Sequence, residues 1–182
     1  CGKTDGDKSS TGKAANVKVG FIFLHDENST YDKNFITAAE EACKKAGVEI
    51  LKKTNISETQ ACYDAAAELV DEGCNVIFAD SFGHEPYVIQ AAKKFPEVQF
   101  LHATGTKAHT EGLSNYHNAF ASIYEGRYLA GVAAGMKLNE MISSGKITAD
   151  KAKMGYVGAY TYAEVISGYT SFYLGAKSVC PS

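Results

Sequence analysis

Tryptophan is absent from the 182-residue chain, and so is any apolar run that approaches the roughly 20 residues of a transmembrane helix. Basic residues are not clustered: the formal net charge is −3, and the lysines and arginines are scattered along the chain. Without a large basic field to attract phosphates, nucleic acid is not an expected partner. The composition is 45% hydrophobic, which suits one full domain or one domain with part of a second.

Catalytic and phosphate-binding signatures are also missing. No G-x-G-x-x-G follows the first apolar run, no Walker sequence occurs, and the stretch ADSFG is not the G-x-S-x-G of a nucleophile elbow. We expect no cysteine in a loop where it would be an activated nucleophile. The sequence therefore predicts no catalytic residues and no cofactor. An α/β hydrolase or isomerase without a signature is the enzymatic alternative.

Three histidines, His25, His84 and His102, fall near the expected ends of strands and beside acidic residues. Histidines close to acidic side chains are found in metal sites, where both can be ligands. No His-x-His or His-Glu-x-x-His spacing is present, however, and the one His-Glu pair runs directly into Pro86. The sequence favours ordinary loop histidines, and no metal site is predicted.

The first sixteen residues, CGKTDGDKSSTGKAAN, are small, polar and charged, with almost nothing apolar to bury. We expect residues 1–16 to be a disordered tether. A cysteine followed by glycine and a flexible segment is typical of a bacterial lipoprotein whose signal peptide has been removed, with the lipid on Cys1. This interpretation predicts an extracytoplasmic protein anchored to the cell membrane by its lipid. A chain boundary that happens to fall at a cysteine is the alternative.

From residue 17 onward, short apolar runs alternate with helical stretches. The runs are VKVGFIFL, VEILKK, NVIFAD, VQFLHA, NYHNAFA and KMGYVGA. One strand and one helix in about every 25 to 30 residues predict right-handed βαβ crossovers on a parallel sheet. Runs that are so continuously apolar fit strands covered on both faces. The predicted fold class is therefore α/β, with a doubly wound parallel sheet.

Several helix boundaries are indicated by capping residues. The first helix has its apolar residues at three-and-four spacing and is expected to stop at Gly47. The second is expected to open with a capping box that runs from Ser57 to Gln60. The third is expected to begin at Pro86, which a first helical turn accepts.

Ligands of an open parallel sheet bind beyond the carboxyl ends of the strands, where the winding direction reverses. Four segments from distant parts of the chain are expected at that edge: HDENSTYDKNF, ADSFGHEP, HATGTKAH and the start of the helix after NAFAS. The first of them collects carboxylates, amides and aromatics, as ligand-binding loops do. The sequence therefore predicts a small-molecule site at this edge.

Four blocks of the chain follow one another in the order found in a known family: HDENSTYDKNF, NVIFADSFGHEPYVIQAAKKFPEVQFLHATG, NYHNAFASIYEGRYLAGVAAG and GYVGAYTYAEVISGYTSFYLGAKSVCP. They resemble the basic membrane protein family, the lipid-anchored substrate-binding proteins of ABC transporters typified by the purine nucleoside receptor lipoproteins. The resemblance runs from Val17 to the last residue. Its more specific pieces are Asp-Lys-x-Phe and Glu-Gly-x-Tyr-Leu-Ala-Gly.

The resemblance implies the fold of type I periplasmic binding proteins, in which two doubly wound lobes enclose the ligand in a cleft. Residues 17–121 would form the first lobe. Residues 122–182 would be the start of a second lobe, too short to bury a sheet of its own. The resemblance also implies a nucleoside-like ligand, an ABC transporter permease as partner and a lipid on Cys1. A small-molecule sensor receptor is the other non-enzymatic interpretation.

Ligand-binding residues follow from the resemblance as well. Family members place a Phe of the Asp-Lys-x-Phe block against the base, here Phe35, and an Asp nine residues earlier on the ligand, here Asp26. Core packing is the alternative role for Phe35. The alternatives for Asp26 are a solvated loop acid and a helix cap, but Asp32 is the better candidate for the cap, which leaves Asp26 freer to bind a ligand.

The remaining predicted contacts lie in the same loops: Asn28, Asn34, Ser81, Phe82 and Gly83. The chain departs from the family after the fourth strand, where an acid is replaced by Thr104, beside His102. A threonine hydroxyl can hydrogen-bond a ligand but supplies no charge. The resemblance therefore supports a binding protein more strongly than a purine nucleoside as its ligand.

No disulfide is expected among Cys43, Cys62 and Cys74. Right-handed crossovers put the first of them on the opposite face of the sheet from the other two. Those two are twelve residues apart on one expected helix. That spacing is about 18 Å at 1.5 Å per residue, well beyond the roughly 7 Å limit for bridging.

Overall fold

The computed structural model describes residues 16–180, which form two compact units divided between Phe120 and Ala121. The expected tether, apart from its last residue, and its Cys1 lie outside the described residues.

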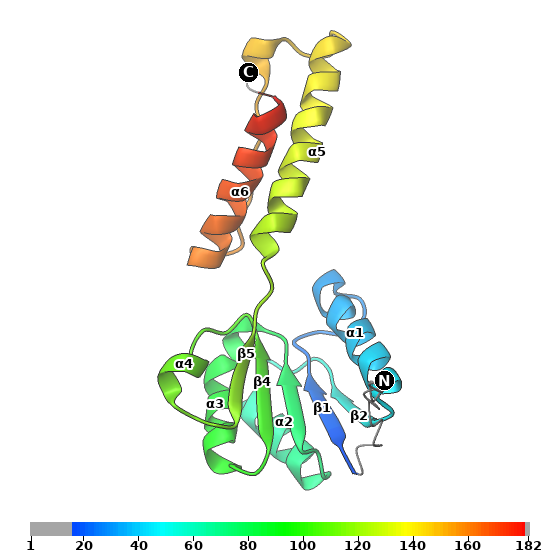
Figure 1. The fold of residues 1–182 in the computed structure, drawn as a ribbon, viewed down its shortest axis with the longest axis vertical. Helices are drawn as coiled ribbons and strands as arrows, with labels where there is room; N and C mark the ends of the chain where they lie inside the picture. Colours follow the sequence, from blue (N-terminus) through cyan, green and yellow to red (C-terminus); the bar gives the residue numbers. More distant parts are fainter. Residues whose placement is uncertain (1–15, 181–182) are drawn as a thin grey trace, which may run out of the picture. The chain divides into compact units, whose positions relative to one another are not determined.

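The first unit is built on a five-stranded parallel sheet with the strand order β2-β1-β3-β4-β5 (Figure 1). Its strands are β1 (Lys18–Ile22), β2 (Glu49–Lys53), β3 (Val76–Ala79), β4 (Gln99–Ala103) and β5 (Tyr116–Ala119). Each strand falls within one of the apolar runs, because strands buried between layers of helices require them. The predicted α/β class with a parallel sheet is confirmed.

Helices cover both faces of this sheet (Figure 1). They are α1 (Thr30–Ala46), α2 (Gln60–Asp71), α3 (Glu85–Lys94) and the short α4 (Ala108–Glu111). Ile36 and Ala39 of α1 are buried with Phe23 in a small apolar cluster. The larger core joins the buried residues of α2 and α3 to strand residues such as Ile22 and Ile77. The two clusters are separate because the side chains of a strand alternate between the faces of the sheet.

Helix α1 has an N-cap and a C-cap that explain its limits. The cap at its start is Ser29, whose hydroxyl accepts a hydrogen bond from the backbone N of Asp32 at 3.3 Å. Asp32 is thus in the first turn of the helix and not at the cap. The helix stops at Gly47, which adopts a left-handed φ of 68°, and this expected end is confirmed.

Helix α2 begins later than expected. Its N-cap is Thr59 and its first residue is Gln60, so the predicted capping box from Ser57 is wrong. The hydroxyl of Ser57 lies 2.8 Å from that of Thr59, and the carboxylate of Glu58 bonds to the loop after β3. The expected start of the third helix is close to the observed one, with Pro86 in the first turn of α3.

The second unit contains two long helices, α5 (Ile123–Ser143) and α6 (Ala163–Val179), and a short 3-10 helix, η2 (Ala149–Lys151). The long helices approach each other through glycine. A Cβ on Gly131 would lie 2.0 Å from the carbonyl oxygen of Phe172, and one on Gly175 would lie 2.1 Å from that of Tyr128. The two backbones are therefore in direct contact at these positions.

The strand expected at KMGYVGA is absent from the described part of the second unit, so this prediction is wrong. Residues 153–159 lie in the connection between the two long helices, and Val157 is 97% exposed. A strand forms only when a neighbour accepts and donates its backbone hydrogen bonds. None of the described residues of the second unit supplies that neighbour.

The four described cysteines, Cys43, Cys62, Cys74 and Cys180, are free and buried. Cys74 does not lie on α2, which ends at Asp71, but in the loop that follows, so the expectation that Cys62 and Cys74 share one helix is wrong. This thiol is not activated, because burial raises its pKa. Burial likewise raises the pKa of Cys43, and it raises that of Cys62 to about 12.

Candidate functional site

The carboxyl ends of the five parallel strands share one edge of the sheet. Ile22 at the end of β1 pairs with Ala79 at the end of β3, and Ala79 pairs with His102 near the end of β4. The segments that continue from these ends, with the one after β2, are named the carboxyl-edge loops: residues 23–29, 54–59, 80–84 and 104–107. Parallel pairing therefore places most of the predicted contact residues at the same edge.

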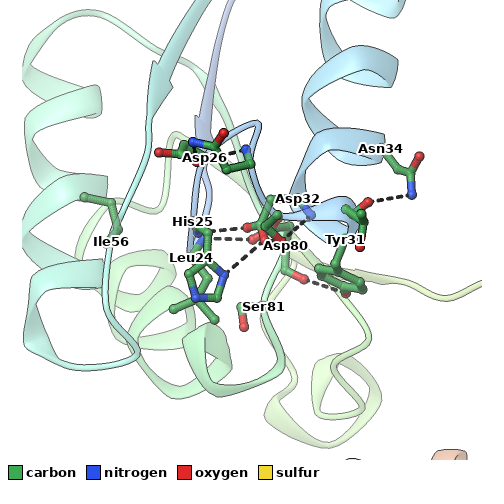
Figure 2. Close-up of polar contacts among 12 residues, drawn as sticks. Leu24, His25, Asp26, Tyr31, Asp32, Asn34, Ile56, Asp80 and Ser81 are labelled. Atoms are coloured by element: carbon green, nitrogen blue, oxygen red, sulfur yellow. Dashed lines mark hydrogen bonds and ion pairs between the residues drawn. The ribbon is translucent and has the colours of Figure 1, made fainter.

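Two buried acids, Asp32 and Asp80, lie beneath the loop after β1 and are named the acid pair (Figure 2). Asp32 Oδ1 accepts a hydrogen bond from the backbone N of His25 at 2.9 Å. Asp80 Oδ1 accepts one from the backbone N of Leu24 at 3.2 Å. The hydroxyl of Ser29 donates to Asp32 Oδ2 at 2.5 Å. The acid pair therefore holds the backbone at the start of this loop.

Only one member of the acid pair is ionised at neutral pH. Burial and the nearby charge of Asp32 raise the pKa of Asp80 to about 8. Burial alone would also raise the pKa of Asp32, but hydrogen bonds from Ser29 and His25 outweigh it and hold that pKa below its usual value. At pH 7 a largely neutral Asp80 thus lies beside an ionised Asp32, as expected when two carboxylates share a buried site.

Asp26 is partly exposed and accepts hydrogen bonds from the backbone N and the side-chain Nδ2 of Asn28, both at 2.9 Å. These bonds lower the pKa of Asp26, so its carboxylate is charged and available at the edge. Asn34 is arranged differently. Its amide donates to the backbone carbonyl of Thr30 at 2.9 Å, on the exposed side of α1 and away from the acid pair (Figure 2). The structure therefore does not bring Asn34 together with Asp26.

Phe35 is partly buried and packs against aromatic neighbours. Its ring centroid is 5.0 Å from that of Tyr31 and 6.3 Å from that of Phe78. The hydroxyl of Tyr31 donates to the backbone carbonyl of Asp80 at 3.0 Å, which ties this aromatic group to the loop after β3. Phe35 thus has the packing role that the sequence left open, and part of its surface remains exposed.

Ser81, Phe82 and Gly83 form the turn after β3. Ser81 is buried, while the side chain of Phe82 is 40% exposed. Glu58, from the loop after β2, accepts hydrogen bonds from the hydroxyl of Ser81 and the backbone N of Gly83. The sequence suggested Glu58 only as part of a capping box, so its contact with this turn was missed.

His84 and His102 are fully buried. Nε2 of His84 lies 2.9 Å from the carbonyl oxygen of Ile56, and Nε2 of His102 lies 2.6 Å from that of Ser81. A carbonyl can only accept, so each Nε2 carries the proton and each Nδ1 is an acceptor. Burial lowers the pKa of both rings, which keeps them neutral. Within residues 16–180, no group of three or more potential ligand side chains is arranged to hold a metal ion.

Buried polar atoms without a hydrogen-bond partner are concentrated at this edge. In the described part of the chain they are Asp80 Oδ2, His84 Nδ1, His102 Nδ1 and Thr104 Oγ1. All four belong to β4 or to the loops after β3 and β4. Native proteins leave few buried polar atoms unpaired. Four such atoms in one region therefore indicate a candidate site for the polar groups of a ligand.

Glu85 is a further organising residue that the sequence did not reveal. It is buried, and its Oε1 accepts hydrogen bonds from the backbone N atoms of Thr106 and Lys107 at 2.8 Å and from the hydroxyl of Tyr116 at 2.9 Å. These bonds outweigh the effect of burial and lower the pKa of Glu85. A glutamate before a proline carries no sequence signal for such a role, which depends on the loop after β4 folding back onto α3.

Thr104 combines two unfavourable features, a φ of 67° for a β-branched residue and a buried hydroxyl without a partner. Thr104→Val keeps the shape of the side chain and removes the hydroxyl. We expect it to raise the free energy of unfolding of the ligand-free protein by about 1 kcal/mol, measured by urea denaturation. Thr110→Val is the control, since the hydroxyl of Thr110 donates to Lys107 at 3.0 Å. A loss of stability in Thr104→Val would show that its hydroxyl is paired in solution.

No helix among the described residues is long and apolar enough to cross a membrane.

Comparison with known proteins gives matches over most of the chain. The family model described as ABC transporter substrate-binding protein, PnrA-like, matches residues 19–182. A purine-binding protein of Brucella abortus is 35% identical over 170 residues, which cover 91% of this chain and 44% of that protein. A putative ABC transporter glucose-binding protein of Haloferax volcanii is 27% identical over 187 residues, which cover 98% of this chain and 41% of that protein. The chain thus spans less than half the length of these relatives.

Solved structures share the fold. An ABC transporter solute-binding protein of Aeropyrum pernix has a TM-score of 0.71 at 16% identity, over 90% of this chain and 43% of that one. A solute-binding protein from Conexibacter woesei has a TM-score of 0.67 at 16% identity, over 91% of this chain and 51% of that one. The resemblance read from the sequence blocks is confirmed, and the chain belongs to the Bmp family of PnrA-like ABC transporter substrate-binding proteins.

Proposed function

We propose that the chain forms one lobe, and the beginning of a second, of an extracytoplasmic binding protein that delivers a purine nucleoside to an ABC transporter permease. The observation that carries this proposal is the group of four buried, unpartnered polar atoms at the carboxyl edge. A parallel sheet binds its ligands at that edge. Family membership supports a receptor over an enzyme, and the protein is expected to return its ligand chemically unchanged.

A flat heterocycle suits the side chains at this edge. Phe35 and Phe82 each keep part of a ring exposed, and Asp26 supplies a charged acceptor. Aromatic faces hold a base by stacking, and a carboxylate binds ring N–H groups or vicinal hydroxyls. The purine-binding relative also shares more identity with the chain than the putative glucose-binding one.

The lipid anchor on Cys1 and the domain limits at residues 16 and 121 belong to the same proposal. The small, polar composition of residues 1–16 supports a tether, and the break in contacts at Ala121 supports a lobe boundary there. Ser81, Gly83, Asn28 and Thr104 are proposed as further ligand contacts. The exposed position of Asn34 makes it the weakest member of the predicted set.

Asp26→Ala should weaken binding by about 1 to 3 kcal/mol, or roughly five- to 150-fold, through loss of a charge-assisted acceptor. Phe35→Leu should cost a similar amount, about 1 to 3 kcal/mol, because it keeps apolar volume in the core but removes the ring face. Calorimetry on the full-length protein with adenosine, guanosine, inosine and glucose measures both. Mass spectrometry of the recovered compounds tests for turnover.

Glu27→Ala is the matched control for Asp26, since Glu27 is an exposed acid of the same loop. It is expected to leave the affinity within about twofold of the wild type. If a ligand is found and both Asp26→Ala and Phe35→Leu bind it as tightly as the wild type, the loop after β1 is a connector. Conversion of a compound during the measurement would instead favour the enzymatic alternative.

A further inference from the structure

The turn at residues 81–83, which follows β3, is held by a side chain from the loop after β2, a strand that does not pair with β3. Glu58 belongs to the loop after β2, whereas the turn follows β3, and β1 lies between these strands in the sheet. Glu58 Oε1 accepts hydrogen bonds from the hydroxyl of Ser81 at 2.5 Å and from the backbone N of Gly83 at 2.8 Å. One carboxylate oxygen therefore ties two carboxyl-edge loops together across the end of β1.

The sequence of the turn is adapted to this contact. A Cβ on Gly83 would lie 2.4 Å from Cδ of Glu58 and 2.5 Å from Oε2, so only glycine allows the carboxylate to come so close. On its other side, the turn is fixed by the carbonyl of Ser81, which accepts from Nε2 of His102 at 2.6 Å and from the backbone N of His84 at 3.0 Å. Ser81 is thus held at both its hydroxyl and its carbonyl.

The loop that carries Glu58 is itself anchored. The backbone N of Ile56 donates to the carbonyl of Phe23 at 3.0 Å, and the carbonyl of Ile56 accepts from Nε2 of His84 at 2.9 Å. The main chain two residues before Glu58 is therefore fixed to the residue that follows β1 and to the residue that follows the turn. Because this main chain is fixed, the side chain of Glu58 loses little conformational entropy when its carboxylate binds Ser81 and Gly83.

We propose that Glu58 is a positioning residue of the binding site, which fixes the turn at residues 81–83 in the conformation that presents Phe82 and Gly83 to the ligand. The ligand in this inference rests on the proposed function, whereas the geometry of the turn does not. Without the shared acceptor, the hydroxyl of Ser81 and the N–H of Gly83 turn to solvent, and the glycine gives the turn many other backbone conformations. Ligand binding then has to restore the lost order.

A role limited to folding predicts a different pattern. Glu58 also lies directly before Thr59, the N-cap of α2, where a negative charge favours the helix. If that were its whole contribution, its removal would lower the thermal stability and leave the turn and the affinity unchanged. Exchange at the Gly83 amide and ligand affinity, each compared with the melting temperature, therefore separate the two roles.

The variants are Glu58→Ala, which removes the acceptor, and Glu58→Gln, which keeps a side-chain oxygen at the same reach. Glu40→Ala is the matched control, because Glu40 is an exposed glutamate of α1 whose ion-pair partner is Lys52. All are made in the full-length protein. Hydrogen exchange at the amide of Gly83 is measured without ligand, and affinity is measured by calorimetry with adenosine, guanosine and inosine.

Glu58→Ala is expected to speed exchange at Gly83 by at least about tenfold and to weaken the affinity for a bound nucleoside about five- to thirtyfold. Glu58→Gln should restore both to within about threefold of the wild type, because an amide oxygen still accepts. Unchanged exchange at Gly83 in Glu58→Ala would overturn the proposal, and so would faster exchange with unchanged affinity. If no nucleoside binds the wild type, the proposed function fails, and the exchange at Gly83 alone decides the role of Glu58.

Discussion

Gly131→Ala is expected to break the packing of α5 against α6 and to cost at least about 3 kcal/mol of stability in the second unit. The added Cβ would lie 2.0 Å from the carbonyl oxygen of Phe172 and 2.8 Å from its carbonyl carbon. Both are backbone atoms of the facing helix and cannot turn away as a side chain would. Accommodation therefore requires the helices to separate, which exposes the residues packed between them. Gly175→Ala should act in the same way, because its Cβ would lie 2.1 Å from the carbonyl oxygen of Tyr128.

Gly126→Ala is the matched control on the same helix. A Cβ at this position would meet only Cδ1 of Ile123, at 3.9 Å, which is ordinary contact. Alanine is the better helix former, so this variant should gain up to about 1 kcal/mol. Hydrogen exchange of the α5 and α6 amides, with thermal unfolding followed by circular dichroism, measures both. Equal protection in the Gly131→Ala and Gly126→Ala proteins would show that the close approach of the helices is absent in solution.

The free energy of unfolding is expected to fall by about 1 kcal/mol between pH 7 and pH 8, and Asp80→Asn should remove this fall. The pKa of Asp80 is about 8 in the folded protein and has an ordinary value of 3.8. Between these values the unfolded chain has released the proton that the folded chain keeps. The stability that the neutral acid contributes is therefore fully present below the pKa of Asp80 in the unfolded chain. It is lost as the pH rises through the pKa of Asp80 in the folded protein.

The other groups around Asp80 do not obscure this window. Asp32 has a lowered pKa and is ionised throughout it. His84 and His102 also have lowered pKa values, so their contribution is lost only as the pH falls below the ordinary value of 6.5. Cys62, which the charge of Asp80 affects, titrates near 12 in the folded state.

Urea denaturation at closely spaced pH values measures the slope, with Asp64→Asn as the control. Asp64 is an exposed acid of α2, so its variant should keep the wild-type dependence on pH. In Asp80→Asn the amide mimics the neutral acid and cannot ionise. If the wild type and Asp80→Asn show the same slope, the carboxyl group of Asp80 is ionised or solvated in the folded protein.

The sheet was predictable because its signals are local. Buried parallel strands require continuous apolar runs, and five of the six runs became strands. The sixth, residues 153–159, is also an apolar run but lacks a pairing partner among the described residues, and no local pattern encodes that. The cap of α2 failed for a related reason. The turn after β3, more than twenty residues away along the chain, takes the side chain of Glu58, so a local capping pattern at Ser57 could not reveal it.

The edge that carries the candidate site was predictable from topology, but the contacts among its side chains were not. Parallel strands bring Asp26 and Ser81 to one edge whatever the details of the loops. The acid pair depends on more than that, because Asp32 and Asp80 are 48 residues apart and meet only when α1 is docked against the end of β3. Thr104 was identified from the resemblance. Its left-handed backbone and unpaired hydroxyl are properties of the folded loop alone.

The rate at which each buried thiol is alkylated reports how often the unit around it opens. Cys62 lies in the core of the first unit with no exposed surface, and Cys180 is buried in the second. An alkylating reagent reaches such a thiol only while the structure around it is open, so the rate of modification follows the frequency of opening. The two positions fall in different proteolytic fragments and can be followed in one sample by mass spectrometry. The chain thus carries its own reporters of whether the two units open together or one at a time.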